Sequence, residues 1–425
     1  PGIFSSLVLL LAAIPLPAHC AEWWLEPSIF LKSGYNSNIR LTPASHDSVW
    51  EASVKPGARF GVETAARGIR GNAWANIRRY TGGSGRESSN SLDREDYHGD
   101  LFGFYNTLRN NWGLRLDYTK DSTLDSQLEE TGLVSDRVTR HRYIFNPTWS
   151  RILTQRIRLD ANYSYNQVDY SNNFQARLSD YKYQRVSTGL VYELSERDSL
   201  TLQAAYADFD PEFGADSETA SLQAGYSREF NETLRASIFA GGRRTKTNGD
   251  ETIPSGFCVG SNPGAQFPEC PGGIPVVTGF NTNGISDTST GSIFSADITK
   301  DWQTASITMS LSRQVTPTGF GDLIDKKRAK VVGRKRLTRL LTSSLSIEYF
   351  KTEGVNTESD VTSRRVDREL FRIIPHLRWR LTREWDLGAS YEYTRQDRKN
   401  SDNDAKRHAA YLTLTYRWPR ISMSR

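Results

Sequence analysis

The sequence predicts an all-β protein, a single closed antiparallel transmembrane β-barrel of about 18 strands, with 16 as the alternative count. In residues 157–165 the odd positions are apolar or aromatic and the even positions are mostly polar. Successive side chains of a strand point to opposite faces, so this segment has one apolar and one polar face. The same pattern recurs along the chain, with aromatic residues near the strand ends and with connections that alternate between short and long. Together these features are typical of transmembrane β-strands.

The predicted strands follow one another along the whole chain. Those of the first half are 23–34, 49–64, 71–80, 97–108, 112–119, 140–149, 157–165, 183–194 and 200–209. Those of the second half are 218–230, 234–244, 292–300, 305–314, 330–337, 345–351, 371–380, 385–395 and 410–418. Residues 120–135 are expected to form a polar connection and residues 245–290 a long loop rich in Gly and Pro. No segment of useful length has a helical period.

The alternation also predicts which side chains face the lipid. We expect Leu116, Leu159, Tyr163, Leu202 and Leu412 to point outward. Asp117, Arg158 and Gln203 are expected to point into the lumen.

The strand at 330–337 is unusual because it lies within a basic run, residues 326–339. Without this strand, the later long and short connections would change sides, whereas both termini of such barrels lie at the end with the short turns. The parity of the barrel therefore predicts a strand. The basic side chains would line the lumen, bind lipopolysaccharide phosphates at the outer rim, or lie in a solvated loop.

The first residues carry an apolar core followed by small residues, so residues 1–20 are predicted to be a secretory signal peptide and residues 21–425 the barrel. Cys20 raises the alternative of a lipid anchor, but His19 occupies a position that needs a small residue in lipoproteins. Past this segment, no apolar run approaches the ~20 residues that a membrane helix requires. Export permits disulfides, and we expect one between Cys258 and Cys270, contributing ~2–3 kcal/mol to stability.

Several short segments resemble a family of Gram-negative outer-membrane β-barrels. They are Asp121–Gly132, Arg140-His-Arg142, Pro147-Thr-Trp149, Leu178–Tyr181, Leu194–Asp198 and the early pattern Trp24…Pro27…Tyr35-Asn-Ser-Asn38. The family is of the β-barrel porin type and occurs beside exopolysaccharide and exosortase-type gene clusters. The resemblance spans most of the mature chain and rests on structural motifs. It implies an outer-membrane location and a role in polysaccharide export, and it identifies no catalytic residue.

The polar faces of the strands carry the candidate functional residues. The arginines expected to contact a solute in the lumen are Arg115, Arg142, Arg158, Arg235, Arg372, Arg378 and Arg380, and Arg243 has the same parity. A lumen with excess positive charge concentrates anions, because the low-dielectric wall focuses the field. In the alternative interpretation, these arginines pair with acidic residues across the lumen and hold the wall rigid. The candidate acidic partners are Asp117, Asp160, Glu193, Glu348 and Glu392.

Other chemistry finds little support in the sequence. The candidate residues for a barrel lipase or protease are His98, His141, His376 and His408, but no nucleophile signature accompanies them. No cluster of metal-ligand spacing occurs, so neither a metal nor a cofactor is expected. The net charge of +5 on 425 residues is too small to indicate nucleic-acid binding.

The sequence therefore predicts an outer-membrane channel that favours anionic solutes and serves exopolysaccharide export. Its expected partners are outer-membrane lipid and lipopolysaccharide, an anionic polysaccharide and periplasmic export components. The alternatives are a barrel enzyme and a structural or receptor barrel whose extracellular loops carry the function.

Overall fold

The computed structural model describes residues 21–43, 48–82, 92–130, 137–171, 178–259, 274–355, 367–398 and 404–424. The predicted signal peptide and Cys270 lie outside these residues. Among the described residues, no helix is both long and apolar enough to cross a membrane.

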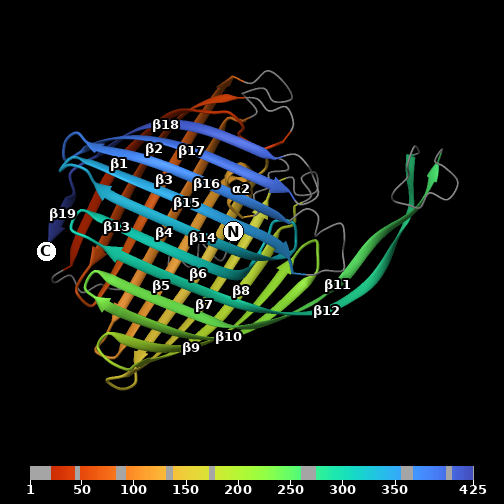
Figure 1. The fold of residues 1–425 in the computed structure, drawn as a ribbon, viewed down its shortest axis with the longest axis horizontal. Coiled ribbons are helices and arrows are strands. Elements are labelled where there is room, and N and C mark those ends of the chain that lie inside the picture. Colours follow the sequence, from red (N-terminus) through yellow and green to blue (C-terminus); the bar gives the residue numbers. More distant parts are fainter. Residues whose placement is uncertain are drawn as a thin grey trace.

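One antiparallel sheet contains every described strand (Figure 1). Its first nine strands are β1 (Glu22–Asn36), β2 (Val49–Glu63), β3 (Arg67–Gly82), β4 (Arg94–Asn106), β5 (Asn110–Ser122), β6 (Thr139–Ile152), β7 (Ile157–Tyr170), β8 (Tyr181–Glu193) and β9 (Asp198–Pro211). The next nine are β10 (Asp216–Asn231), β11 (Leu234–Val259), β12 (Ile274–Asp301), β13 (Ala305–Pro317), β14 (Leu323–Arg336), β15 (Leu341–Gly354), β16 (Arg368–Arg380), β17 (Trp385–Arg398) and β18 (Ala405–Arg417).

The sheet closes on itself between its first and last strands. Residues Ser28 to Asn36 of β1 pair with β18. Residues Glu22 to Leu25, at the start of β1, pair with the short strand β19 (Ile421–Ser424). Every other strand pairs with its neighbours in the sequence. The prediction of a closed antiparallel barrel is confirmed with 18 barrel strands, including the basic strand β14 that the parity of the connections required.

The two ends of the barrel differ in their connections. The turns at one end are short, for example 107–109 between β4 and β5 and 232–233 between β10 and β11. The connections at the other end are mostly long, for example 37–48 and 123–138. We call these the short-turn end and the long-loop end.

Cross-strand pairing assigns the residues to an inner and an outer face. Leu159, Leu190 and Leu202 lie side by side on β7, β8 and β9, and Leu202 is half exposed on the outer surface. Leu412 is exposed on the outer face, while Leu116 is covered there by its neighbours. Asp117, Arg158 and Gln203 belong to the opposite, inner face, so the placement agrees with the predicted register. Many outer residues are exposed apolar or aromatic side chains, which form the belt expected of a barrel that faces lipid.

Two segments differ from the prediction. The described parts of the predicted loop, residues 245–259 and 274–290, are not irregular, because β11 and β12 continue through them as a paired ribbon that projects from the rim (Figure 1). Consecutive backbone pairing holds this ribbon despite its glycines and prolines, with a register shift between Ser255 and Gly256. The connection 120–135 contains a short helix, α2 (Thr123–Glu130). Its eight residues are too few to give a clear helical period in the sequence.

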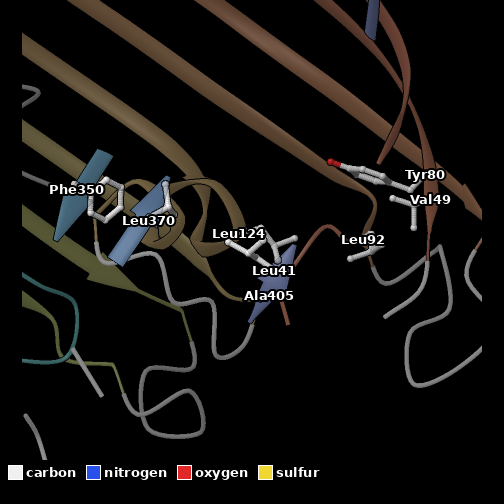
Figure 2. Packing of buried hydrophobic residues seen from close by; sticks show 8 residues of the cluster. All are labelled: Leu41, Val49, Tyr80, Leu92, Leu124, Phe350, Leu370 and Ala405. Atoms are coloured by element: carbon white, nitrogen blue, oxygen red, sulfur yellow. The ribbon is translucent and has the colours of Figure 1, made fainter. Parts of the chain in front are cut away.

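Connections at the long-loop end fold back against the inner wall. Leu41, Leu92 and Leu124 come from three such connections, and they pack with wall residues into one buried apolar cluster (Figure 2). The wall residues are Val49, Tyr80, Phe350, Leu370 and Ala405. A second cluster joins Val138, just before β6, and residues of β7–β9 to Leu323 at the start of β14. Nearby, Ser179 donates its backbone N–H to the carbonyl of Gly319, 2.7 Å away. These contacts narrow the lumen at the long-loop end.

Candidate functional site

The inner face of β14–β18 is strongly basic. Every second residue of β14 faces the lumen, and Lys330 pairs across the strands with Glu348 on β15. The inward basic residues of β14 are Lys326, Arg328, Lys330, Arg334 and Arg336. Of the three interpretations of the basic run, the structure supports the one in which it lines the lumen. Lys327, on the outer face, instead pairs with Glu353 at 2.8 Å.

Near the short-turn end, three arginines share one carboxylate. Asp386 on β17 lies 2.5 Å from Arg378 and 4.0 Å from Arg380, and it also contacts Arg417 on β18. The carboxylate is buried, while each guanidinium remains about half exposed to the lumen. We call this group the Asp386 cluster. It carries an excess of two positive charges, because one anion offsets only one of three cations.

Arginines also share carboxylates halfway along the same wall. Glu348 accepts from Arg328 at 2.5 Å and lies 3.9 Å from Arg372. Arg372 in turn lies 3.4 Å from Glu392, which also binds Arg407. Arg372 and Arg407 are largely buried in this network, whereas Arg328 is exposed. The network therefore fixes the positions of β14–β18 and still leaves a guanidinium toward the lumen.

A second group of predicted residues lies on β4–β6. Arg115 and Arg142 both approach the buried Asp117, at 3.4 and 4.0 Å, and His98 lies 3.9 Å from the same carboxylate. Arg115 is half exposed. Here too one carboxylate serves more than one cation.

The two remaining predicted arginines are separate from these groups. Arg158 forms an ion pair with Asp160 on its own strand at 3.1 Å, and Arg235 lies 3.4 Å from Asp301 near the short-turn end. Each has one partner, and all four side chains are substantially exposed. Arg243 is buried and reaches Asp325 at 3.5 Å.

Helix α2 is held against the inner wall by a carboxylate. Asp125 lies 2.9 Å from Arg78 on β3 and 2.6 Å from Arg94 on β4. Burial acts to raise the pKa of Asp125, but the positive charges of Arg94 and Arg78 outweigh this effect and hold that pKa well below its usual range. Leu124 adds apolar contact beside this ion-pair latch. The helix is thereby fixed inside the long-loop end.

Sequence reasoning missed several members of these groups. Arg417 lies at inward parity on the predicted strand 410–418, so the alternation alone could have found it. Arg328 and Arg407 also have inward parity, but they precede the predicted starts of their strands, at residues 330 and 410. The partners of Arg78 and Arg94 could not be found in this way, because Asp125 reaches them from a connection that folds back into the barrel.

Among the described residues, the histidines form no recognisable catalytic site. His98 contacts Asp100 at 3.1 Å and Thr119 at 3.0 Å, but the Thr119 hydroxyl donates to Asp117 and so has no proton for the imidazole to accept. His141 and His408 each contact a tyrosine hydroxyl on the outer face. In the described residues, no group of three His, Cys, Asp or Glu side chains is placed to hold a metal ion. The predicted Cys258–Cys270 disulfide lies outside the described side chains.

The closed barrel of 18 strands, its apolar outer belt and its charged interior define the class of the protein: a membrane-spanning β-barrel of the bacterial outer-membrane type. No family model and no curated protein sequence matches the chain. Solved structures that resemble it include OccAB1 of Acinetobacter baumannii, with 12% identity, a TM-score of 0.45, and coverage of 93% of this chain and 97% of that one.

Two structures from Pseudomonas aeruginosa are similar to a comparable degree. OprD has 10% identity and a TM-score of 0.43 over 94% of this chain and 95% of its own. OccK2 in complex with glucuronate has 10% identity and a TM-score of 0.43 over 93% of this chain and 97% of its own. All three TM-scores lie below 0.5, so these similarities do not identify a family.

Proposed function

We propose that the protein is an outer-membrane channel for passive diffusion that favours anionic solutes. The observation that carries the proposal is the sharing of carboxylates among arginines, most clearly in the Asp386 cluster. An arginine paired one to one with an acid contributes little net field, whereas a shared acid leaves uncompensated positive charge. The low-dielectric wall focuses that charge into the lumen.

The arrangement also suits release of the solute. Arg115, Arg378 and Arg380 remain hydrated and about half exposed, so each would offer a weak and exchangeable contact to a carboxylate or phosphate. Conduction through several weak sites requires this balance between entry and exit. The long-loop end would face the cell exterior, as in other barrels of this class.

The test is a measurement of ion selectivity in planar bilayers. With a KCl gradient, we expect the reversal potential of the native protein to indicate anion preference. Replacing Arg115, Arg378 and Arg380 together with Glu should convert this to cation preference. Lys335→Glu is the matched control, because Lys335 carries the same charge on the outer face of β14. A native channel that prefers cations would contradict the proposed selectivity, and a native barrel without any current would contradict the channel itself.

The remaining expectations stay predictions. They are the signal peptide, the exopolysaccharide cargo, and lipopolysaccharide and periplasmic export components as partners. The second candidate function is that of a receptor or adhesin built on the long loops. Such a protein would bind its ligand at the cell surface, and its barrel would conduct no ions. A barrel enzyme would instead lose activity on replacement of His98, with its folding and current unchanged.

A further inference from the structure

A cavity of about 730 Å³ lies in the lumen toward the short-turn end, and its lining departs from the polar inner face of the barrel. Phe102 and Phe104 on β4 and Phe239 on β11 all border it. These rings have inward parity, as their pairing with Arg115, Gly113 and Ser295 shows. Phe102 is 38% exposed. A phenyl ring in a water-filled lumen loses the stabilisation that burial of its apolar surface would give it. Such departures from a local pattern concentrate at functional sites.

Each ring lies across a glycine of a neighbouring strand. A Cβ atom added at Gly68 would come within 2.8 Å of the Phe104 ring, and one at Gly113 within 3.3 Å of the Phe102 ring. Gly225 lies beneath Phe239 in the same way. The absence of a side chain beneath each ring lets the ring lie against the wall. Phe102, Phe104 and Phe239 thus border the cavity with their rings against the wall, and Arg70 lies over the Phe104 ring, 5.3 Å from its centroid. We call the three rings the phenylalanine platform.

The polar groups around the platform are neutral or compensated. Asn106, Asn162 and Gln203 line the cavity, and their side-chain amides bond to no other group within the described part of the chain. The cavity is also lined by two arginines, each with an acidic partner. Arg158 pairs with Asp160 at 3.1 Å, and Arg70 pairs with Glu63 at 2.5 Å. Unlike the Asp386 cluster, this cavity has one carboxylate for each arginine, so its surface combines donors and acceptors without a large net charge.

We propose that this cavity is a saccharide-binding subsite of the channel, in which pyranose rings pack on the phenylalanine platform and their hydroxyls bond to the surrounding amides. The inference rests on the proposed channel function and specifies its solute. The C–H face of a sugar ring is apolar and fits an aromatic face, while each hydroxyl both donates and accepts as an amide does. The cavity has the volume of a typical ligand site.

Other ligands fit the lining less well. A purely aromatic solute would stack on the phenylalanines but leave the amides of Asn106, Asn162 and Gln203 without partners, which disfavours its binding. A small inorganic anion would be drawn to the Asp386 cluster, where the positive charge is in excess. Only a ligand with apolar faces and many hydroxyls uses both parts of the lining.

The experiment is the blocking of single-channel current by neutral linear oligosaccharides of glucose, mannose and galactose, added to the full-length protein in planar bilayers. We expect at least one of them to produce brief blocks. Phe102→Ala combined with Phe104→Ala should shorten the blocks about tenfold, whereas Phe102→Tyr, which keeps the ring, should not. Phe371→Ala is the matched control, since Phe371 is also 38% exposed but lies on the outer face. Block durations are compared within the open-channel current of each variant, and Phe371→Ala is the variant expected to leave that current unchanged.

The outcomes separate the two proposals. A channel that conducts ions but is blocked by none of the sugars would overturn the saccharide subsite and leave the channel standing. The saccharide subsite would also be overturned if the blocks had the same duration in the double variant. It would be overturned as well if phenol blocked the current as effectively as the sugars do. A native protein that carries no ion current would contradict the channel, and the subsite would fall with it.

Discussion

Two parts of the inner wall are built from different chemistry. On β14–β18, shared ion pairs join neighbouring strands, as in the Asp386 cluster. On β9–β13, pairs of neutral hydroxyls join neighbouring strands, and the shared ion pair of Arg243 and Arg313 is made with Asp325 of β14. Thr219 and Thr245 lie 3.0 Å apart, as do Ser217 and Thr247, while Thr299 and Thr308 are separated by 3.3 Å. We call these parts the charged wall and the neutral wall.

The difference indicates that strand register and the electrostatic field of the lumen do not depend on the same side-chain contacts. A neutral hydrogen bond contributes about 0.5–1.5 kcal/mol and a bond to a charged group about 1.5–3 kcal/mol. Both walls keep a regular antiparallel register, so ion pairs are not required for pairing. The excess arginines of the charged wall are the feature on which the proposed preference for anions rests. Three changes would break or sharpen this comparison.

The largest effect is expected from Asp386→Asn. The change leaves Arg378, Arg380 and Arg417 close together without an anion between them. Loss of one partner of a buried ion pair costs about 3–5 kcal/mol, and we expect about 2 kcal/mol here because the guanidiniums are half exposed and screened. Urea unfolding in lipid vesicles measures the loss. The control is Asp297→Asn on the neutral wall, where the carboxylate accepts from Ser310 and should contribute less than about 1 kcal/mol. Equal losses at both positions would remove the distinction between the walls.

A smaller effect is expected from Asp125→Asn, which removes the latch of α2. Arg94 would lose its charged partner on the helix, at about 1–2 kcal/mol after allowance for the exposure of Asp125. We expect larger and noisier single-channel currents as the helix leaves the wall. Glu95→Gln, at an exposed position on the same strand as Arg94, is the control.

The same latch gives a pH dependence. The pKa of Asp125 is lower in the folded protein than its ordinary value of 3.8, so the ionised latch stabilises α2 fully above that value. Its contribution disappears only as the pH falls through the lowered pKa. Currents should therefore be alike from pH 8 to about pH 5. Opening of the native channel between those values would show that another group holds the helix.

The smallest effect is expected on the neutral wall. Thr299→Val leaves the Thr308 hydroxyl without its partner, and we expect about 1 kcal/mol of destabilisation. Replacing both threonines with Val should be nearly neutral, because no polar group is then left unpaired. Urea unfolding of the two variants checks this. A double variant that is less stable than the single one would show that the two hydroxyls stabilise the fold by more than their mutual hydrogen bond.

The sequence by itself determined the barrel, because alternation of apolar and polar residues leaves little freedom in which face meets lipid. It predicted the 18 strands, the register of Leu202 and Gln203, and even the basic strand β14, since the parity of the connections required one. It also found several arginines of the inner wall, Arg378 and Arg380 among them, because inward parity is a local property.

Only the tertiary structure decided which groups meet. Asp386 gathers arginines from β16 and β18, and Asp125 reaches Arg78 and Arg94 from a connection that folds back into the lumen. The phenylalanine platform likewise joins β4 and β11, which lie far apart in the chain. Period and parity fix the face on which a side chain lies, but its partners depend on strand register, on closure of the barrel and on the path of the loops. These are non-local properties, and no stretch of sequence encodes them alone.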